Sequence, residues 1–178
     1  EMIAKLEAQR DAQARQRLDL VAGEAGLAQA QRIARLGSWE FDIPANRLEW
    51  SDETFRIFGL DPAAFAATPE AFFASVHPED RASMHEAHAA VLEGRARLDH
   101  EHRIVTPDGA VKVVHERGEL RRDAQGRPLR LSGTVLDITE RKRAEREREL
   151  LAAIVDSSND AIWSRDLDDK VLTWNAGA

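Results

Sequence analysis

The chain has 178 residues, of which 43% are hydrophobic and 32% charged, enough for one domain core and the start of a second. Its 32 acidic and 25 basic residues give a net charge of −7, which argues against a nucleic-acid surface. Because the chain contains no cysteine, disulfides, thiolate metal sites, cysteine nucleophiles and cysteinyl adducts to a flavin are excluded.

Two helices are predicted before the first strand. Residues 1–22 contain no Pro or Gly and are rich in helix-forming residues. Their apolar stripe is too thin for a stable isolated helix, so we expect this helix to pair with a second copy. The following segment, GLAQAQRIARLG, is expected to be a helix that buries Leu27 and Ile33 and is closed by Gly37. We treat residues 1–26 as an N-terminal helix and linker.

The next segments predict a hairpin followed by helices. SWEFDI and RLEW alternate apolar and polar residues around the turn at residues 44–46, which is typical of a β-hairpin. DETFRIFG is expected to form a short helix that buries its Phe and Ile residues. A longer helix is expected to begin at Pro78, with His77 as its cap, and to end at Gly94.

Three further strands are predicted at residues 97–105, 110–120 and 127–138, joined by turns that contain Asp and Gly. Together with the hairpin they indicate an α+β domain with a single antiparallel sheet. A charged helix follows at residues 139–158, and we expect Asp137 with Glu140, or Thr139, to cap it.

The hairpin sequence occurs twice. WEFDIPANRLEWS and WSRDLDDKVLTWN share both Trp residues and three further positions at a constant offset of 124 residues. We therefore expect residues 159–178 to be the start of a truncated second domain of the same kind. Because a lone hairpin is marginally stable, we expect residues 160–178 to be disordered, swapped or docked on a neighbour.

Five motifs resemble the PAS family of sensory domains, and the resemblance covers residues 27–138. These motifs are AQRIARLGSWEFD, WSDETFRIFGLDP, VHPEDR, HRIVTPDGAVKVV and GTVLDITERKRAE. In this family an Asp-Ile-Thr-like triplet ends the last strand and starts the output helix, and here it matches Asp137, Ile138 and Thr139. The resemblance implies a PAS fold, a five-stranded antiparallel sheet with helices on one face, flanked by coiled-coil-like helices. One departure is Val113, which replaces a Trp of many relatives in the cavity wall.

The resemblance implies a sensory and signal-relaying module of a bacterial multidomain receptor, most often a sensor histidine kinase. Diguanylate cyclases or phosphodiesterases are alternative outputs, and a ligand-free dimerisation spacer is an alternative of another class. We expect a parallel homodimer through the flanking helices and an output domain in cis as the downstream partner. No apolar run reaches the ~20 residues of a membrane helix and no signal peptide is visible, so a cytoplasmic segment without a membrane partner is expected.

A small-molecule pocket is expected between helices and sheet. Its predicted lining residues are Phe55, Phe58, Phe72, Met84, His88, Val91, Ile104 and Val113. Haem-binding members of the family use a histidine of the long helix, so His88 is either a haem ligand or a structural histidine. Trp39 and Trp50 either stack on a non-covalent flavin or, as we favour, pack in the sheet. The cofactor is left unknown.

No catalytic or metal site is predicted, and the segment is not expected to be an enzyme. His85 and His88 fall one residue short of the HExxH zinc signature. His100 and His102 share a strand face without a third ligand, and are expected to face solvent or the pocket rim. His115 is assigned as an ordinary strand residue. The runs of acidic residues are assigned to solvated helix faces.

Overall fold

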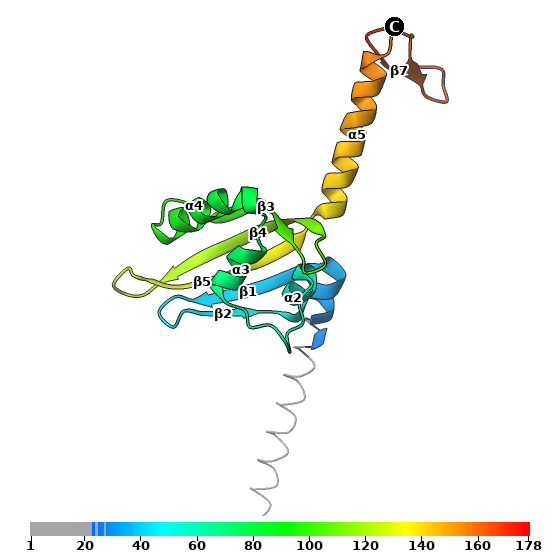
Figure 1. The fold of residues 1–178 in the computed structure, drawn as a ribbon. Helices are drawn as coiled ribbons and strands as arrows, with labels where there is room; N and C mark the ends of the chain where they lie inside the picture. Colours follow the sequence, from blue (N-terminus) through cyan, green and yellow to red (C-terminus); the bar gives the residue numbers. More distant parts are fainter. Residues whose placement is uncertain (1–22, 24, 27) are drawn as a thin grey trace, which may run out of the picture. The chain divides into compact units, whose positions relative to one another are not determined.

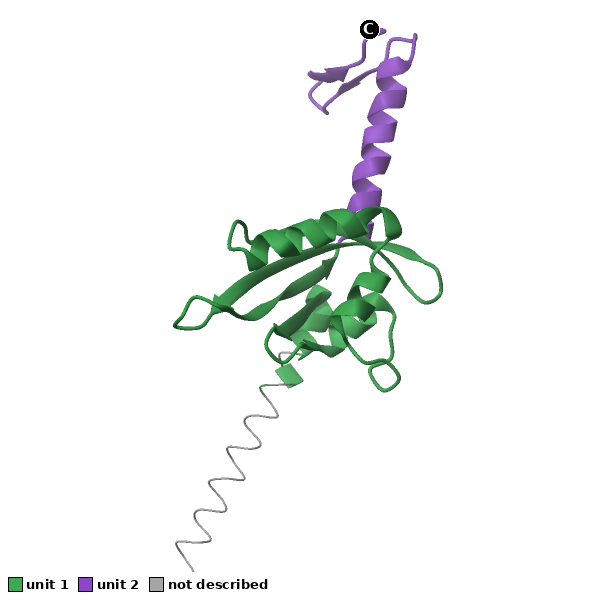
Figure 2. Cartoon of the chain, turned by 60° about the vertical axis from the view of Figure 1, so that its left-hand side comes forward, with its two compact units in different colours: residues 1–137 green, residues 138–178 purple. Residues whose placement is uncertain are grey.

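The computed structural model describes residues 23, 25–26 and 28–178, so the helix predicted for residues 1–22 lies outside the described part. The chain divides into two compact units, residues 1–137 and residues 138–178, shown in two colours in Figure 2. Within the described residues, no helix has the length and apolar character needed to cross a bilayer.

The first unit contains one five-stranded antiparallel sheet in the order β2-β1-β5-β4-β3, with helices over one face (Figure 1). Its strands are β1 (Leu36–Asp42), β2 (Arg47–Trp50), β3 (Leu98–Val105), β4 (Val111–Arg122) and β5 (Pro128–Asp137). Its helical segments are α2 (Asp52–Phe58), α3 (Pro69–Ser75), the 3₁₀ turn η1 (Pro78–Asp80) and α4 (Arg81–Leu92). The predicted α+β class and the five-stranded sheet are confirmed.

The helix ends follow from local sequence. Ser51 is the N-cap of α2 and accepts a hydrogen bond from the Thr54 amide, and Gly59 ends the helix with a φ of +70°. His77 is the N-cap of η1, and its Nδ1 accepts from the Glu79 amide. The long helix predicted to begin at Pro78 begins instead at Arg81, after this 3₁₀ turn. Pro78 occupies the first position of η1, where its missing N–H leaves no hydrogen bond unmade.

The segment before β1 differs from the prediction. Residues 28–34 are helical, but Ile33 is 77% exposed rather than buried. Gly37 lies inside β1 and does not close a helix. A Cβ atom on Gly37 would lie 2.4 Å from the Thr54 Oγ1, so the glycine allows α2 to approach the strand. The apolar helical pattern could not reveal this packing requirement.

The core lies between the sheet and the helices. One row of inward-facing residues crosses all five strands and consists of Trp50, Trp39, Gly133, Gly118 and Leu98. A Cβ atom on Gly133 or Gly118 would approach the Trp39 ring to within 2.8 or 3.0 Å. The two glycines therefore leave the space that the indole fills, and Trp39 is 8% exposed.

The second unit contains α5 (Thr139–Ser157) and a hairpin of β6 (Trp163–Arg165) and β7 (Val171–Trp174). The N-cap position of α5 is Ile138, which makes no side-chain capping bond, so the N-cap residue is neither Asp137 nor Thr139. The Ile138 side chain is apolar and only 3% exposed. Its burial explains why an apolar residue stands where a polar cap was expected.

The hairpin of the second unit repeats the hydrogen bonds of the β1–β2 hairpin. Trp163 pairs with Trp174 as Trp39 pairs with Trp50. The Ile162 amide donates to the Asn175 Oδ1 at 2.9 Å, and the Ala178 amide donates to the same oxygen at 3.1 Å.

Ser51 accepts from the Ser38 and Thr54 amides in the same way, at 3.0 and 3.3 Å. Residues 163–174 thus form the same kind of hairpin as β1 and β2. Trp163 and Trp174 are nevertheless 52% and 75% exposed, so the hairpin has no packed core of its own around these rings.

Candidate functional site

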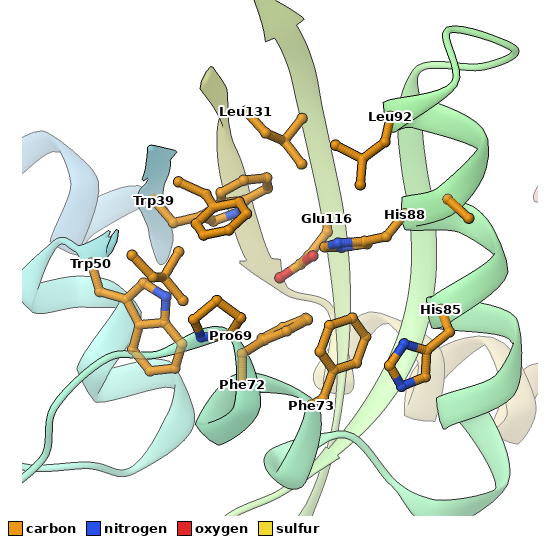
Figure 3. Close-up of a pocket in the computed structure, with 13 residues that line it drawn as sticks. Trp39, Trp50, Pro69, Phe72, Phe73, His85, His88, Leu92, Glu116 and Leu131 are labelled. Atoms are coloured by element: carbon orange, nitrogen blue, oxygen red, sulfur yellow. The ribbon is translucent and has the colours of Figure 1, made fainter. Parts of the chain in front are cut away.

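A pocket of about 280 Å³ lies between α3, α4 and the sheet (Figure 3). Ten of its lining residues are apolar, namely Trp39, Phe41, Leu48, Trp50, Pro69, Phe72, Phe73, Ala89, Leu92 and Leu131. The other three carry titratable groups and are His85, His88 and Glu116. An apolar wall with a few polar groups is the usual composition of a small-molecule site.

Aromatic rings form much of the wall. The Trp50 ring centroid lies 5.3 Å from that of Phe55 and 4.6 Å from that of Phe58, which ties β2 to α2. On the other side, the His85 ring stacks on Phe73 at 3.9 Å between centroids. These contacts fix the rings in place, so the wall is largely pre-formed.

Glu116 is the unusual residue of the site. It comes from the interior strand β4, is 3% exposed, and points into the pocket among apolar side chains (Figure 3). Within the described residues no hydrogen bond to its carboxyl group is found. Burial raises the pKa of Glu116 from 4.5 to about 8, so its carboxyl group is mostly protonated at neutral pH.

Three side chains near the core carry fully buried polar atoms without a hydrogen-bond partner among the described residues. They are Trp39 at Nε1, His88 at Nε2 and His102 at both ring nitrogens. Burial lowers the pKa of His88 and of His102 from 6.5 to about 4, so both rings are neutral at pH 7. The pocket thus combines neutral donors and acceptors with an apolar wall. Buried polar groups of this kind are satisfied when a ligand or water supplies the missing partner.

Of the predicted pocket residues, some line the pocket and others are buried elsewhere in the core. Phe72 and His88 line the pocket. Five others are buried in the core without lining it, namely Phe55, Phe58, Met84, Val91 and Ile104. Val113 does not belong to the cavity wall, because strand residues alternate between faces and the neighbouring Val114 is the one fully buried in the core.

The prediction missed Glu116, a single acidic residue in a strand, because only the runs of acidic residues on helices were considered. A signal was present in AVKVVHERGEL, where Val114, Glu116 and Gly118 occupy alternate positions of one strand. A charged residue on the inward face of a central strand is rare unless it has a function. The expectation that His102 faces solvent or the pocket rim is also wrong, since its side chain is 2% exposed.

The pocket does not fit haem. His88 projects from α4 toward the pocket, as a haem ligand would, but a macrocycle does not fit in about 280 Å³, which lies below the usual ~300–1,000 Å³ range of ligand sites. The His88 ring is also stacked on Phe72, with centroids 5.8 Å apart. Trp39 and Trp50 pack within the sheet and contribute to the wall at the same time. No cluster of three metal-ligating side chains occurs in the described part of the chain.

Helix α4 is anchored to β3 by an ion pair at its N-terminal end. The Asp80 carboxylate accepts hydrogen bonds from the Arg103 amide, Nε and Nη2 at 2.8, 2.9 and 2.6 Å. The hydrogen bonds from Arg103 lower the pKa of Asp80 to about 2. This pair holds the first turn of α4, and therefore positions His85 and His88.

A chain of contacts leads from the pocket wall to the end of β5. Trp50 lines the pocket and packs on Phe58 of α2. The neighbouring Ile57 carbonyl accepts a hydrogen bond from the Lys112 Nζ at 2.6 Å. The same Nζ lies 4.0 Å from the Asp137 Oδ2, at the last residue of β5. The predicted relay residue Asp137 is therefore linked through Lys112 to α2.

Comparisons with known proteins agree with this architecture. Sensor protein FixL of Bradyrhizobium diazoefficiens is 31% identical over 113 residues, which are 62% of this chain and 22% of FixL. The chain therefore spans about a fifth of this curated relative.

Solved structures of sensory domains are also similar. A sensory box histidine kinase/response regulator from Burkholderia thailandensis has a TM-score of 0.61 at 28% identity, covering 71% of this chain and 94% of that one. A domain of a light and redox sensing histidine kinase from Haloarcula marismortui has a TM-score of 0.52 at 26% identity, covering 58% and 90%. Residues 47–135 match the family described as the PAS fold. The chain belongs to the PAS-fold family of sensor domains.

Proposed function

We propose that this PAS domain senses a small molecule bound in the pocket between α3, α4 and the sheet and relays its presence to α5. The observation that carries the proposal is the buried, unpaired carboxyl group of Glu116 in an apolar pocket of about 280 Å³. A core selected only for packing has no use for such a group, because burying a polar side chain without a partner costs about 1–3 kcal/mol.

The relay uses the contacts from Trp50 to Asp137. A ligand that displaces the Trp50 ring also displaces Phe58 and the C-terminal end of α2, where Lys112 is bound. Lys112 then redistributes its contacts between the Ile57 carbonyl and Asp137. Two arrangements of this charged group give the end of β5 two states, and ligand binding biases one of them. Thr139, the first residue of α5, receives the change through Ile138.

The output that we propose is a histidine kinase. Two similar solved structures above 25% identity, from Burkholderia thailandensis and Haloarcula marismortui, come from histidine kinases. In this proposal the segment has no catalytic activity of its own, acts in the cytoplasm, and controls a downstream domain of the same polypeptide. A diguanylate cyclase or phosphodiesterase output remains the alternative expected from the sequence.

We further propose that α5 pairs with α5 of a second copy in a parallel homodimer. Leu150, Leu151 and Ile154 are between 56% and 61% exposed on this helix. Ion pairs such as Arg141 with Glu145 lie along the same helix, a distribution typical of coiled coils. A second identical helix would bury these exposed apolar side chains.

The matching hydrogen bonds at Ser51 and Asn175 support a second domain of the same fold beginning near residue 159. In the first domain, Ser51 caps the helix that follows its hairpin. We propose that Asn175 caps the corresponding helix of the second domain. The exposed faces of Trp163 and Trp174 would then be covered by the rest of that domain.

Native mass spectrometry of gently purified protein tests the sensing function. A retained small molecule, released by mild denaturation and lost in a variant with a filled pocket, is the expected result. The competing proposal, a ligand-free dimerisation spacer, predicts that only the bare polypeptide mass is observed. The relay is tested separately by Lys112→Met and Asp137→Ala in the full receptor, which should uncouple output while leaving the fold and ligand binding intact.

A further inference from the structure

Among the described residues, the pocket contains a carboxyl group without a Lys or Arg beside it. Glu116 stands between Val135 of β5 and His100 of β3 in the register of the sheet. None of the described residues that line the pocket is Lys or Arg. Because an ionised carboxylate is strongly destabilised in an apolar site unless it is paired, the natural complement of Glu116 is a cation supplied by the ligand.

The rest of the wall favours the same ligand. Trp39, Trp50, Phe72 and Phe73 all line the pocket, and Figure 3 shows their rings around the space that Glu116 faces. Aromatic faces carry partial negative charge and attract organic cations, most strongly when water is excluded. The same rings also provide apolar contact for a hydrocarbon body. The net charge of −7 favours the approach of a cation rather than an anion.

We propose that the pocket binds a small organic amine, with its ammonium group paired to the Glu116 carboxylate and its apolar body against the aromatic wall. This inference rests on the proposed sensing function and names the chemical class of the ligand. The Trp39 Nε1 and the His88 Nε2, which are unpartnered among the described residues, are available to a second polar group of the same ligand. The volume of about 280 Å³ limits the ligand to a single ring or a short chain.

Binding of the amine is coupled to release of a proton. In the free protein the Glu116 carboxyl group is protonated at neutral pH, because burial raises its pKa to about 8. When the ammonium ion enters, the carboxyl O–H bond breaks, the proton leaves to solvent, and the carboxylate accepts an N–H hydrogen bond from the ligand. One proton is therefore released for each amine bound. Alkylamines keep their charge up to about pH 10, so the ligand itself does not titrate in this range.

Other titratable groups face the same space. They are His85 and His88 from α4. His100 of β3 does not line the pocket but is the cross-strand neighbour of Glu116. The pKa of His88 is lowered to about 4 by burial, so this ring stays neutral and does not repel the amine above that pH. The affinity for the amine should therefore rise about tenfold per pH unit below pH 8 and level off above it.

Isothermal titration calorimetry with three probes of the same shape tests the proposal. The probes are 2-phenylethylamine, 2-phenylethanol and phenylacetate, titrated into the whole chain at pH 6, 7 and 8. Repeating the pH 7 titration in buffers with different ionisation enthalpies measures the protons released. The variants are Glu116→Gln, which keeps the side-chain shape, and Glu119→Gln on the opposite face of β4 as the matched control.

The expected result is that the amine binds most tightly, releases close to one proton at pH 7, and binds about tenfold more tightly at pH 7 than at pH 6. Glu116→Gln should remove both the preference and the proton release, whereas Glu119→Gln should keep them. Binding of the alcohol or the acid as tightly as the amine overturns the amine proposal but leaves the sensing function standing. Absence of binding by all three at millimolar concentration overturns the amine proposal, and an empty pocket in native mass spectrometry then overturns the sensing function as well.

Discussion

Replacing Glu116 by Gln should remove the pH dependence that this residue gives to folding. The pKa of Glu116 is raised by burial from 4.5 to about 8, so the folded state holds its proton more tightly than the unfolded state does. The stabilising contribution is therefore complete below pH 4.5 and is lost as the pH rises through 8. Each pH unit within this window changes the free energy of unfolding by about 1.4 kcal/mol.

The magnitude follows from the width of the window. We take the difference in unfolding free energy between the two proteins at pH 4.5 as the reference. Relative to it, the Gln variant should gain about 3 kcal/mol over the wild type by pH 7 and about 4 kcal/mol by pH 8. His88 and His102, whose pKa values are lowered to about 4, contribute stability that is present above pH 6.5 and lost toward pH 4. This second effect is common to both proteins and cancels in the difference.

Urea unfolding followed by tryptophan fluorescence at pH 5, 6, 7 and 8 measures these differences. Glu119→Gln changes the same residue type on the same strand at an exposed position, and should give a nearly constant difference from the wild type across the pH range. If the curve of Glu116→Gln also runs parallel to that of the wild type, Glu116 is ionised or paired in the folded protein, and the reasoning about the pocket is refuted.

Three further substitutions test the structural account. Asp80→Asn should lower the free energy of unfolding by about 2 kcal/mol at pH 7, because it weakens the charge-assisted hydrogen bonds from Arg103. Since the pKa of Asp80 is lowered to about 2, this loss should shrink from pH 3.8 toward pH 2 in urea titrations. Gly118→Ala should cost about 1–3 kcal/mol and shift the tryptophan emission, because the new Cβ would lie 3.0 Å from the Trp39 ring; an unchanged spectrum and stability would contradict the packed indole. Changing Leu151 and Ile154 together to Ser should weaken dimers in sedimentation equilibrium without changing the circular dichroism, and undiminished association would count against α5 as the interface.

The sheet and most helices could be predicted from the sequence because their signals are local. The period-two alternation around Trp39 and Trp50 and the turns before β4 and β5 determine the strands directly. The repeat of the hairpin was visible for the same reason. The structure adds that Asn175 accepts the hydrogen bond in the second hairpin that Ser51 accepts in the first. The sequence alone does not reveal this equivalence, because Ser and Asn are different residue types.

The pocket could be predicted only in part, because its wall depends on contacts between distant segments. Phe72 and His88 were expected because each lies on the inward face of its helix. Val113 was placed on the wrong face of β4, although the alternation of that strand puts Val114 and Glu116 inside. Once the strand register is known, the same alternation identifies Glu116. Its lack of a partner could be recognised only when the surrounding strands and α4 were in place.

The most direct test of the account is a ligand-observed NMR screen of small fragments against the wild-type chain and two variants of α4. Ala89→Trp adds a large ring at the pocket wall, and Ala82→Trp adds the same ring at an exposed position of the same helix that does not line the pocket. The account predicts that fragments bind the wild type and Ala82→Trp, and that binding is lost in Ala89→Trp. Fragments that bind none of the three proteins, or all three equally, would contradict the claim that this pocket is the sensing site.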